Sequence, residues 1–178
     1  AMSAALIEAV RRQIGLLEKF DFRLIKVSLK ASSVPVTVAA YRAFAETSDY
    51  PLHLGVTEAG TAFRGAIKSA VGIGSLLLDG IGDTIRVSLS APPVEEIRAA
   101  KAILEAAGLR EAAPEIVSCP TCGRTSYDLI SMVSRVEEIV AAVKSSGKTV
   151  SLRKIAVMGC AVNGPGEAAD ADLGIAGG

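Results

Sequence analysis

The chain has 178 residues, half of them hydrophobic, and its 19 basic and 19 acidic side chains give a net charge of zero. No uninterrupted apolar run is long enough to span a bilayer, and the interspersed charges form no basic footprint for nucleic acid. We therefore expect neither a membrane protein nor a nucleic-acid-binding protein. The odd number of cysteines, three, argues against a disulfide framework and fits a reducing compartment such as the cytoplasm.

The beginning of the chain has a helical pattern followed by a strand pattern. Leu6, Val10 and Ile14 recur at helical spacing. Residues 24–29 are predicted to form a short apolar strand that ends near Lys30.

A second helix and a second strand are predicted next. Ser33 can cap the free amides of this helix, and Pro35 suits its first turn. Tyr41 and Phe44 lie on the side that we expect to be buried. The alternating apolar residues of 52–56 predict a strand that ends at the next two residues.

The strand and helix alternation continues up to a glycine. A helix is predicted over 62–78 and a third strand over 85–89. Pro93 opens a further helix, which Gly108 is placed to end. Repeated units of this kind predict an α/β fold with a parallel sheet.

The pattern changes after Arg110, and we expect two domains, 1–110 and 111–178. The second is predicted to contain a helix over 128–144 and a strand over 150–158. That strand leads directly to Cys160.

The three cysteines and one glutamate suggest a metal site. Cys119 and Cys122 form a CxxC pair, whose two thiolates can reach one metal centre from a single turn. Cys160 adds a third thiolate, and the glycine-proline loop after it can turn Glu167 toward the same centre. A 4Fe-4S cluster needs one ligand per iron, so three cysteines leave one iron for a harder or exchangeable ligand.

Two other interpretations of the cysteines remain open. Structural zinc sites are closed by Cys and His, and the only histidine, His53, lies far upstream in a predicted strand. Alternatively, Cys160 is an ordinary buried thiol among apolar neighbours, and the CxxC is a fortuitous turn.

Five stretches of the chain closely resemble the 4-hydroxy-3-methylbut-2-enyl diphosphate synthase family, iron-sulfur enzymes of the non-mevalonate isoprenoid pathway. They are KVSLKAS, PLHLGVTEAG, GIGDTIRVSLS, SCPTCGRT and VMGCAVNGPGEA. The resemblance runs through nearly the whole chain, and the last two strings are the most specific. It implies that 1–110 are the last strand-helix units of a TIM barrel and that 111–178 are a 4Fe-4S cluster-binding domain. It also implies that this chain is a fragment, lacking the first half of the barrel and the end of the cluster domain.

Five polar residues are predicted to lie at strand ends, where TIM-barrel enzymes place their active sites. Lys30, Arg86, Thr57 and Ser88 could bind diphosphate oxygens, and Glu58 could transfer a proton. From the residues alone, solvated strand ends that pair with nearby acids are the simpler interpretation. The family resemblance favours the substrate site.

The resemblance also implies a reaction, a cofactor and partners. Family members convert 2-C-methyl-D-erythritol 2,4-cyclodiphosphate to 4-hydroxy-3-methylbut-2-enyl diphosphate by a two-electron reductive ring opening with loss of water. A 4Fe-4S cluster, a ferredoxin or flavodoxin as electron donor and a homodimer are implied. We expect this chain alone to be inactive, and a non-catalytic metal-binding or scaffold module is the alternative.

Overall fold

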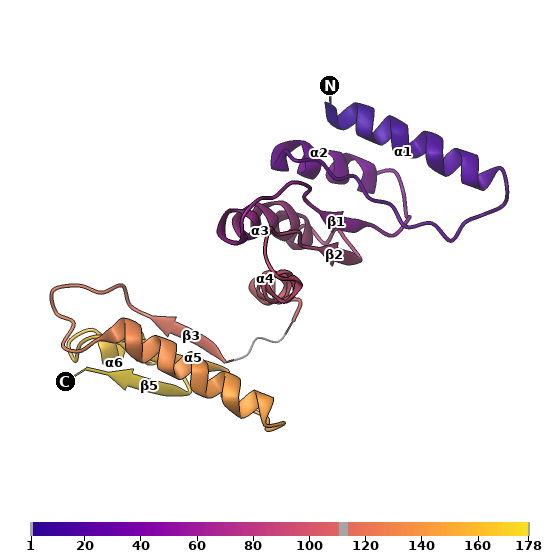
Figure 1. Cartoon of the computed structure of the whole chain (residues 1–178). Coiled ribbons are helices and arrows are strands. Elements are labelled where there is room, and N and C mark those ends of the chain that lie inside the picture. The colour runs from indigo at the N-terminus through magenta and orange to yellow at the C-terminus, as the bar shows by residue number, and fades with distance from the viewer. Residues whose placement is uncertain (1, 111–113, 178) are drawn as a thin grey trace. The chain divides into compact units, whose positions relative to one another are not determined.

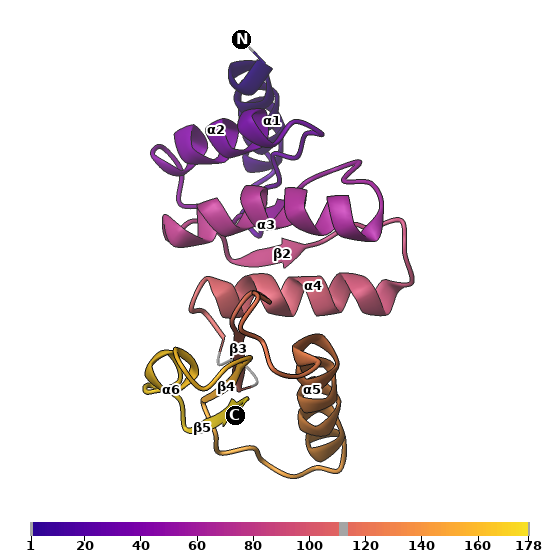
Figure 2. The ribbon, with the colours of Figure 1, turned by 90° about the vertical axis from the view of Figure 1, so that its left-hand side faces the viewer.

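The chain folds into two compact units, Ala1–Arg110 and Glu111–Gly178, which are called unit 1 and unit 2 below. The computed structural model describes residues 2–110 and 114–177. Figures 1 and 2 show the elements of each unit from two sides. Within the described ranges, no helix combines the length and the apolar character needed to cross a membrane.

Unit 1 alternates helices with short strands, as its sequence pattern predicts. Its elements are α1 (Met2–Glu18), α2 (Val34–Ala45), β1 (His53–Gly55), α3 (Ala62–Leu78), β2 (Thr84–Arg86) and α4 (Pro93–Ala106). The predicted bounds of the helix over 62–78 are confirmed, and α4 ends shortly before Gly108, as expected.

The strands of unit 1 run parallel to one another. β1 pairs with β2, with His53 opposite Thr84 and Gly55 opposite Arg86. A single bridge between Val27 and Leu52 adds the preceding segment on the other side of β1. The described part of unit 1 is therefore an α/β arrangement with a small parallel sheet, and it contains no closed barrel.

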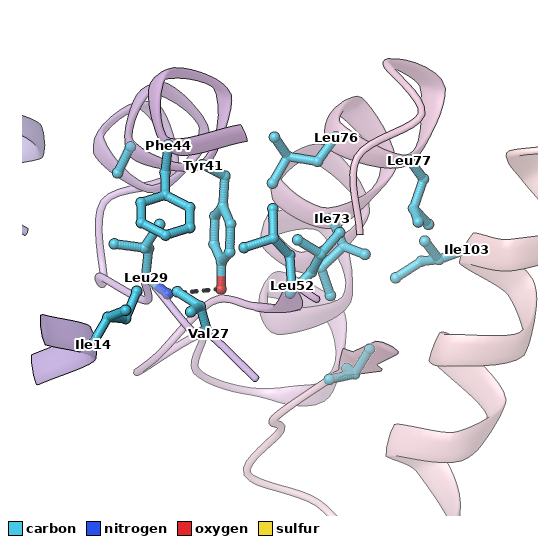
Figure 3. Packing of buried hydrophobic residues seen from close by; sticks show 13 residues of the cluster. Ile14, Val27, Leu29, Tyr41, Phe44, Leu52, Ile73, Leu76, Leu77 and Ile103 are labelled. Atoms are coloured by element: carbon cyan, nitrogen blue, oxygen red, sulfur yellow. Dashed lines mark hydrogen bonds between the residues drawn. The ribbon is translucent and has the colours of Figure 1, made fainter. Parts of the chain in front are cut away.

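The core of unit 1 fills the space between this sheet and its helices. Figure 3 shows Tyr41 and Phe44 of α2 packing toward Val27, Leu29 and Leu52. Tyr41 and Phe44 are at most 1% exposed, which confirms their predicted burial. Burying such large side chains supplies much of the hydrophobic stabilisation of a domain.

Several predictions for unit 1 are wrong in detail. The strands predicted over 52–56 and 85–89 are the shorter β1 and β2. Residues 24–29 form no strand beyond the bridge at Val27, because the Tyr41 hydroxyl takes the position of the next ladder bond. Ser33 is the N-cap residue of α2, but its side chain makes no capping hydrogen bond.

Unit 2 is a three-stranded parallel sheet with one long helix. Its elements are β3 (Glu115–Ser118), α5 (Leu129–Ser145), β4 (Lys154–Met158), α6 (Gly164–Glu167) and β5 (Leu173–Ala176). The strand order is β3-β4-β5. β4 begins four residues later than predicted and ends at Met158, as predicted.

The core of unit 2 lies between α5 and the sheet. Leu129, Val136 and Val140 of α5 pack with Ile155 and Val157 of β4. At the start of α5, the Asp128 carboxylate accepts a hydrogen bond from the amide of Ser131, as a helix N-cap does. This packing fixes the strand ends that carry the cysteines.

Candidate functional site

Polar side chains alternate with the buried core residues along the strand segments of unit 1. This polar face consists of Lys26, Ser28, Lys30, His53, Gly55, Thr84, Arg86 and Ser88, which are separated by core residues such as Val27, Leu29, Leu54 and Val87. Because successive strand residues point to opposite faces of a sheet, the helices cover one face and leave these residues on the other.

Lys30 lies across the strand pair on this face. A Cβ atom added to Gly55 would lie only 3.0 Å from Lys30 Cε and 2.9 Å from the Arg86 carbonyl oxygen. Burial, followed by the charges of Arg86 and Lys26, lowers the pKa of Lys30 below its usual value of 10.5. Because burial and nearby cations destabilise the charged form of Lys30, an anionic partner would stabilise it.

His53 shares the same positive environment. Burial, followed by the charges of Lys30, Lys26 and Arg86, lowers the pKa of His53 below 6.5. Its Nδ1 lies 2.8 Å from the hydroxyl oxygen of Thr84. The ring is therefore neutral at pH 7 and adds a hydrogen-bonding group to the polar face.

Thr57, Glu58 and Ser88 lie at the same ends of the strands as Lys30 and Arg86. The amide of Thr57 donates to the carbonyl oxygen of Ala31 at 3.3 Å, just beyond Lys30. Glu58 is exposed and has a φ of 52°, in the left-handed region that few non-glycine residues adopt. Ser88 is half-buried two residues after Arg86.

The structure does not pair these cations with the acids that the simpler interpretation required. Among residues 2–110 and 114–177, neither Lys30 nor Arg86 forms an ion pair with Glu58 or Asp83. The Asp83 carboxylate instead accepts a hydrogen bond from the amide of Leu52 at 2.7 Å. The positive charge of the polar face is thus not neutralised by these acids.

In unit 2, strand pairing brings two of the cysteine segments together. β3 and β4 are neighbours, with Ser118 opposite Val157. Immediately beyond these strands, the amide of Gly159 donates to Cys119 Sγ at 3.3 Å. This bond ties the start of the CxxC segment to the end of β4.

A second contact ties the CxxC turn to the end of β4. The Thr125 hydroxyl accepts from the amide of Cys122 at 3.1 Å, and the amide of Ser126 donates to the carbonyl oxygen of Gly159 at 2.9 Å. A Cβ atom on Gly159 would lie 2.9 Å from Thr125 Oγ1. Only a residue without a side chain fits there without displacing the turn.

Nearby backbone amides lower the pKa of two of the thiols, which favours their thiolate forms. The backbone amide of Arg124 lowers the pKa of Cys122, and the amides of Asn163 and Val162 lower that of Cys160. The thiolate is the form of cysteine that binds metals. The donor chemistry therefore fits a thiolate-bound metal or cluster.

Neither the three cysteines nor Glu167 gather into one metal-binding group among the described residues. Glu167 is exposed at the end of α6, the short helix that follows Cys160. In the described part of the chain, no three Cys, His, Asp or Glu side chains lie close enough together to hold a metal ion. The proposed ligand set of Cys119, Cys122, Cys160 and Glu167 thus stays a prediction.

Several residues of the polar face escaped the sequence reasoning. Lys26, Ser28 and Thr84 were not singled out, and Tyr41 was assigned only to the core. The signal that could have found the first three is the strict alternation with buried residues along each strand segment. The hydrogen bonds of Tyr41 join α2 to Leu29 and to His53 of β1. A contact between residues so far apart in the chain leaves no periodic pattern in the sequence.

Both parts of the chain match families of known proteins. Residues 1–101 match the family described as GcpE TIM-barrel domain, and residues 115–178 match the family described as GcpE protein C-terminal domain. These matches confirm the family resemblance that the sequence strings indicated.

Curated relatives match the chain from end to end. A protein of Fusobacterium nucleatum is 59% identical over 98% of this chain and 48% of its own length. A protein of Salinispora arenicola is 57% identical over the whole chain and 44% of its own length. Both are named 4-hydroxy-3-methylbut-2-en-1-yl diphosphate synthase (flavodoxin), and the chain spans about half the length of such relatives. The chain therefore belongs to the GcpE family of 4-hydroxy-3-methylbut-2-en-1-yl diphosphate synthases.

Proposed function

We propose that the whole protein of which this chain forms part is a 4-hydroxy-3-methylbut-2-enyl diphosphate synthase. It converts 2-C-methyl-D-erythritol 2,4-cyclodiphosphate to the linear diphosphate with uptake of two electrons and two protons and release of water. The names of the relatives give the product diphosphate and so support the synthase activity. The observation in the structure that supports it best is the polar face, where Lys30 and Arg86 lie together without pairing with Glu58 or Asp83.

In this proposal, the residues at the strand ends of unit 1 bind the substrate. The ammonium of Lys30 and the guanidinium of Arg86 neutralise diphosphate oxygens, because both are cations on one strand face. Thr57 and Ser88 donate hydrogen bonds to the same oxygens. Glu58, exposed at the same edge, transfers a proton to the substrate.

The three cysteines hold the cofactor in this proposal, and Glu167 is the fourth ligand. Cys119 and Cys160 come from the ends of neighbouring strands, and Cys122 from the turn bonded to Thr125. When bound, a 4Fe-4S cluster supplies electrons and a Lewis-acidic iron to the reaction. A carboxylate ligand is exchangeable, so it leaves one coordination position available to substrate.

Partners and location are part of the same proposal. The relatives' names include flavodoxin, so flavodoxin is the preferred electron donor, with ferredoxin as the alternative. We also propose a homodimer in the cytoplasm. We expect this chain alone to be inactive, because its described strands form no closed barrel and TIM-barrel active sites draw on several strands.

The catalytic part of the proposal is tested in the whole protein with the variant Glu58→Gln. We expect turnover to fall about a hundredfold while the cluster spectrum stays unchanged, because a general acid-base group is lost. Glu46→Gln, an exposed glutamate of unit 1 away from the polar face, is the matched control. An unchanged rate in Glu58→Gln would remove Glu58 from the mechanism.

The cofactor is tested by anaerobic reconstitution of this chain with iron and sulfide. We expect about four irons and four sulfides per chain, with loss of both in Cys160→Ala. Stoichiometric zinc would favour a structural metal-binding module instead. A failure to bind any metal, repeated in the whole protein, would support the scaffold interpretation.

A further inference from the structure

A side chain interrupts the hydrogen-bond ladder between β1 and the segment before it. The Val27 amide donates to the carbonyl oxygen of Pro51 at 2.8 Å, and the His53 amide donates to that of Val27 at 2.7 Å. In a parallel pair, the next bond would run from the Leu29 amide to the carbonyl oxygen of His53. The Tyr41 hydroxyl stands there instead: it accepts from Leu29 at 3.0 Å and donates to His53 at 2.6 Å (Figure 3 shows the first bond).

The hydroxyl is held firmly in this position. Tyr41 comes from α2, is 0% exposed, and reaches the strands through the core. Burial raises its pKa, so the hydroxyl keeps the proton that it donates to His53. Backbone contact between the strands resumes at Thr57 and Ala31. The Ser28 hydroxyl also donates to the His53 carbonyl oxygen, at 3.0 Å. Between these points, side-chain hydroxyls therefore bridge β1 and the segment before it, and Tyr41 alone also binds the Leu29 amide.

Next to the Tyr41 hydroxyl, Lys30 crosses the polar face. Lys30 directly follows Leu29, and Gly55 lies two residues after His53 on the facing strand. The stem of Lys30 lies over Gly55, with Cε 3.0 Å from the position that a Cβ atom would occupy. Lys30 therefore lies beside the bridge made by the Tyr41 hydroxyl and over Gly55, which has no side chain to displace it.

We propose that Tyr41 is a positioning residue whose hydroxyl holds β1 and the segment before it apart, so that Lys30 lies across Gly55 and presents its ammonium beside Arg86. The substrate that this ammonium binds rests on the proposed function, whereas the strand geometry does not. Without the hydroxyl, the Leu29 amide can bond His53 directly. The strands then close, and Lys30 is displaced from its place over Gly55.

The first test is the binding of inorganic pyrophosphate and of the cyclic diphosphate to the whole protein, measured by calorimetry. We expect Tyr41→Phe to weaken both about tenfold, the size of a coupling between contacting residues. In a Lys30→Gln background, the same substitution should change affinity little, because Tyr41 acts through Lys30. Phe44→Leu, which alters an equally buried residue of α2, controls for loss of core packing.

The second test is the crystal structure of the Tyr41→Phe protein, which needs no ligand. It should show a direct Leu29 to His53 hydrogen bond and a displaced Lys30. If Tyr41→Phe does not fold, Gly55→Ala displaces the same lysine while keeping the hydroxyl, and it should weaken binding similarly.

Three results would overturn the inference: Lys30 unmoved in the variant structure, equal weakening by Phe44→Leu, or full additivity with Lys30→Gln. A wild-type protein that binds neither ligand would instead contradict the proposed substrate site. The crystal structure would still decide the role of Tyr41.

Discussion

Gly159 is the residue on which the two cysteine segments of unit 2 meet. Its amide donates to Cys119 Sγ, its carbonyl oxygen accepts from Ser126, and Thr125 fills the space where its side chain would lie. Cys160 follows it directly. One small residue therefore contacts Cys119 and directly precedes Cys160, two of the proposed ligands.

We predict that Gly159→Ala weakens iron binding by about tenfold, the lower end of the effect of residues that support metal ligands. The added methyl group would displace Thr125 and, with it, the CxxC turn. Metal and sulfide content after reconstitution would measure the effect. Gly166→Ala is the control, because a Cβ atom there meets no atom within 4 Å. Equal metal content in the two variants would contradict the prediction.

At the level of elements, the edge between β4 and β5 depends on one carboxylate. Asp172 accepts hydrogen bonds from the amides of Arg153 at 2.6 Å and Lys154 at 2.9 Å. The Lys154 amide, followed by that of Arg153, lowers the pKa of Asp172 below 3.8. The carboxylate thus replaces missing strand partners where β4 begins.

This lowered pKa predicts how the stability of unit 2 depends on pH. Because the folded-state pKa lies below the unfolded value, the ionised carboxylate stabilises the fold above pH 3.8. That contribution is lost as the pH falls through the folded-state pKa. In Asp172→Asn, we expect a lower melting temperature at pH 7 and a smaller further loss on acidification. Thermal unfolding followed by circular dichroism at pH 7 and at a pH below 3.8, with Asp170→Asn as control, would test this. Parallel pH profiles for wild type and Asp172→Asn would contradict it.

Elements that are specified by their own residues could be predicted from the sequence. Elements whose hydrogen bonds are supplied by residues far away in the chain could not. The bounds of α3 followed from its apolar period. The strand over 24–29 failed because Tyr41 replaces its ladder partner. β4 starts only at Lys154, where the distant Asp172 carboxylate accepts from the amides of Arg153 and Lys154. For the site, the sequence identified the cysteines and the strand-end cations. The position of Glu167 depends on how the segment after Cys160 folds, which a motif does not specify.

At the scale of the whole molecule, unit 1 exposes much apolar surface. Phe63, Ile67, Val71 and Leu78 lie at helical spacing on α3 and are 49% to 77% exposed. Large contiguous apolar patches are unusual on monomeric proteins and mark interaction surfaces, and a row of exposed apolar side chains along one helix can contribute to such a patch. The small sheet also leaves strand edges open, which favours pairing with another chain.

We therefore predict that this chain self-associates in solution. Sedimentation velocity or solution scattering over a range of concentrations should show a rising mean mass. Phe63→Lys combined with Leu78→Lys should reduce the association, because both side chains are already exposed and tolerate charge. A monodisperse monomer at all concentrations would contradict the prediction.

Because the strands of unit 2 are parallel, the carboxyl ends that carry the cysteines and the amino ends lie at opposite ends of the sheet. This separation is useful for protein engineering. The cysteines follow the carboxyl ends of β3 and β4, while the exposed turn around Gly147 and Lys148 precedes β4 and lies toward the opposite edge. A fluorescent reporter or an affinity peptide inserted at that turn would not interrupt the thiol-bearing segments. Surface attachment through the same turn would leave those segments facing the solution, which suits electrochemical work on this protein.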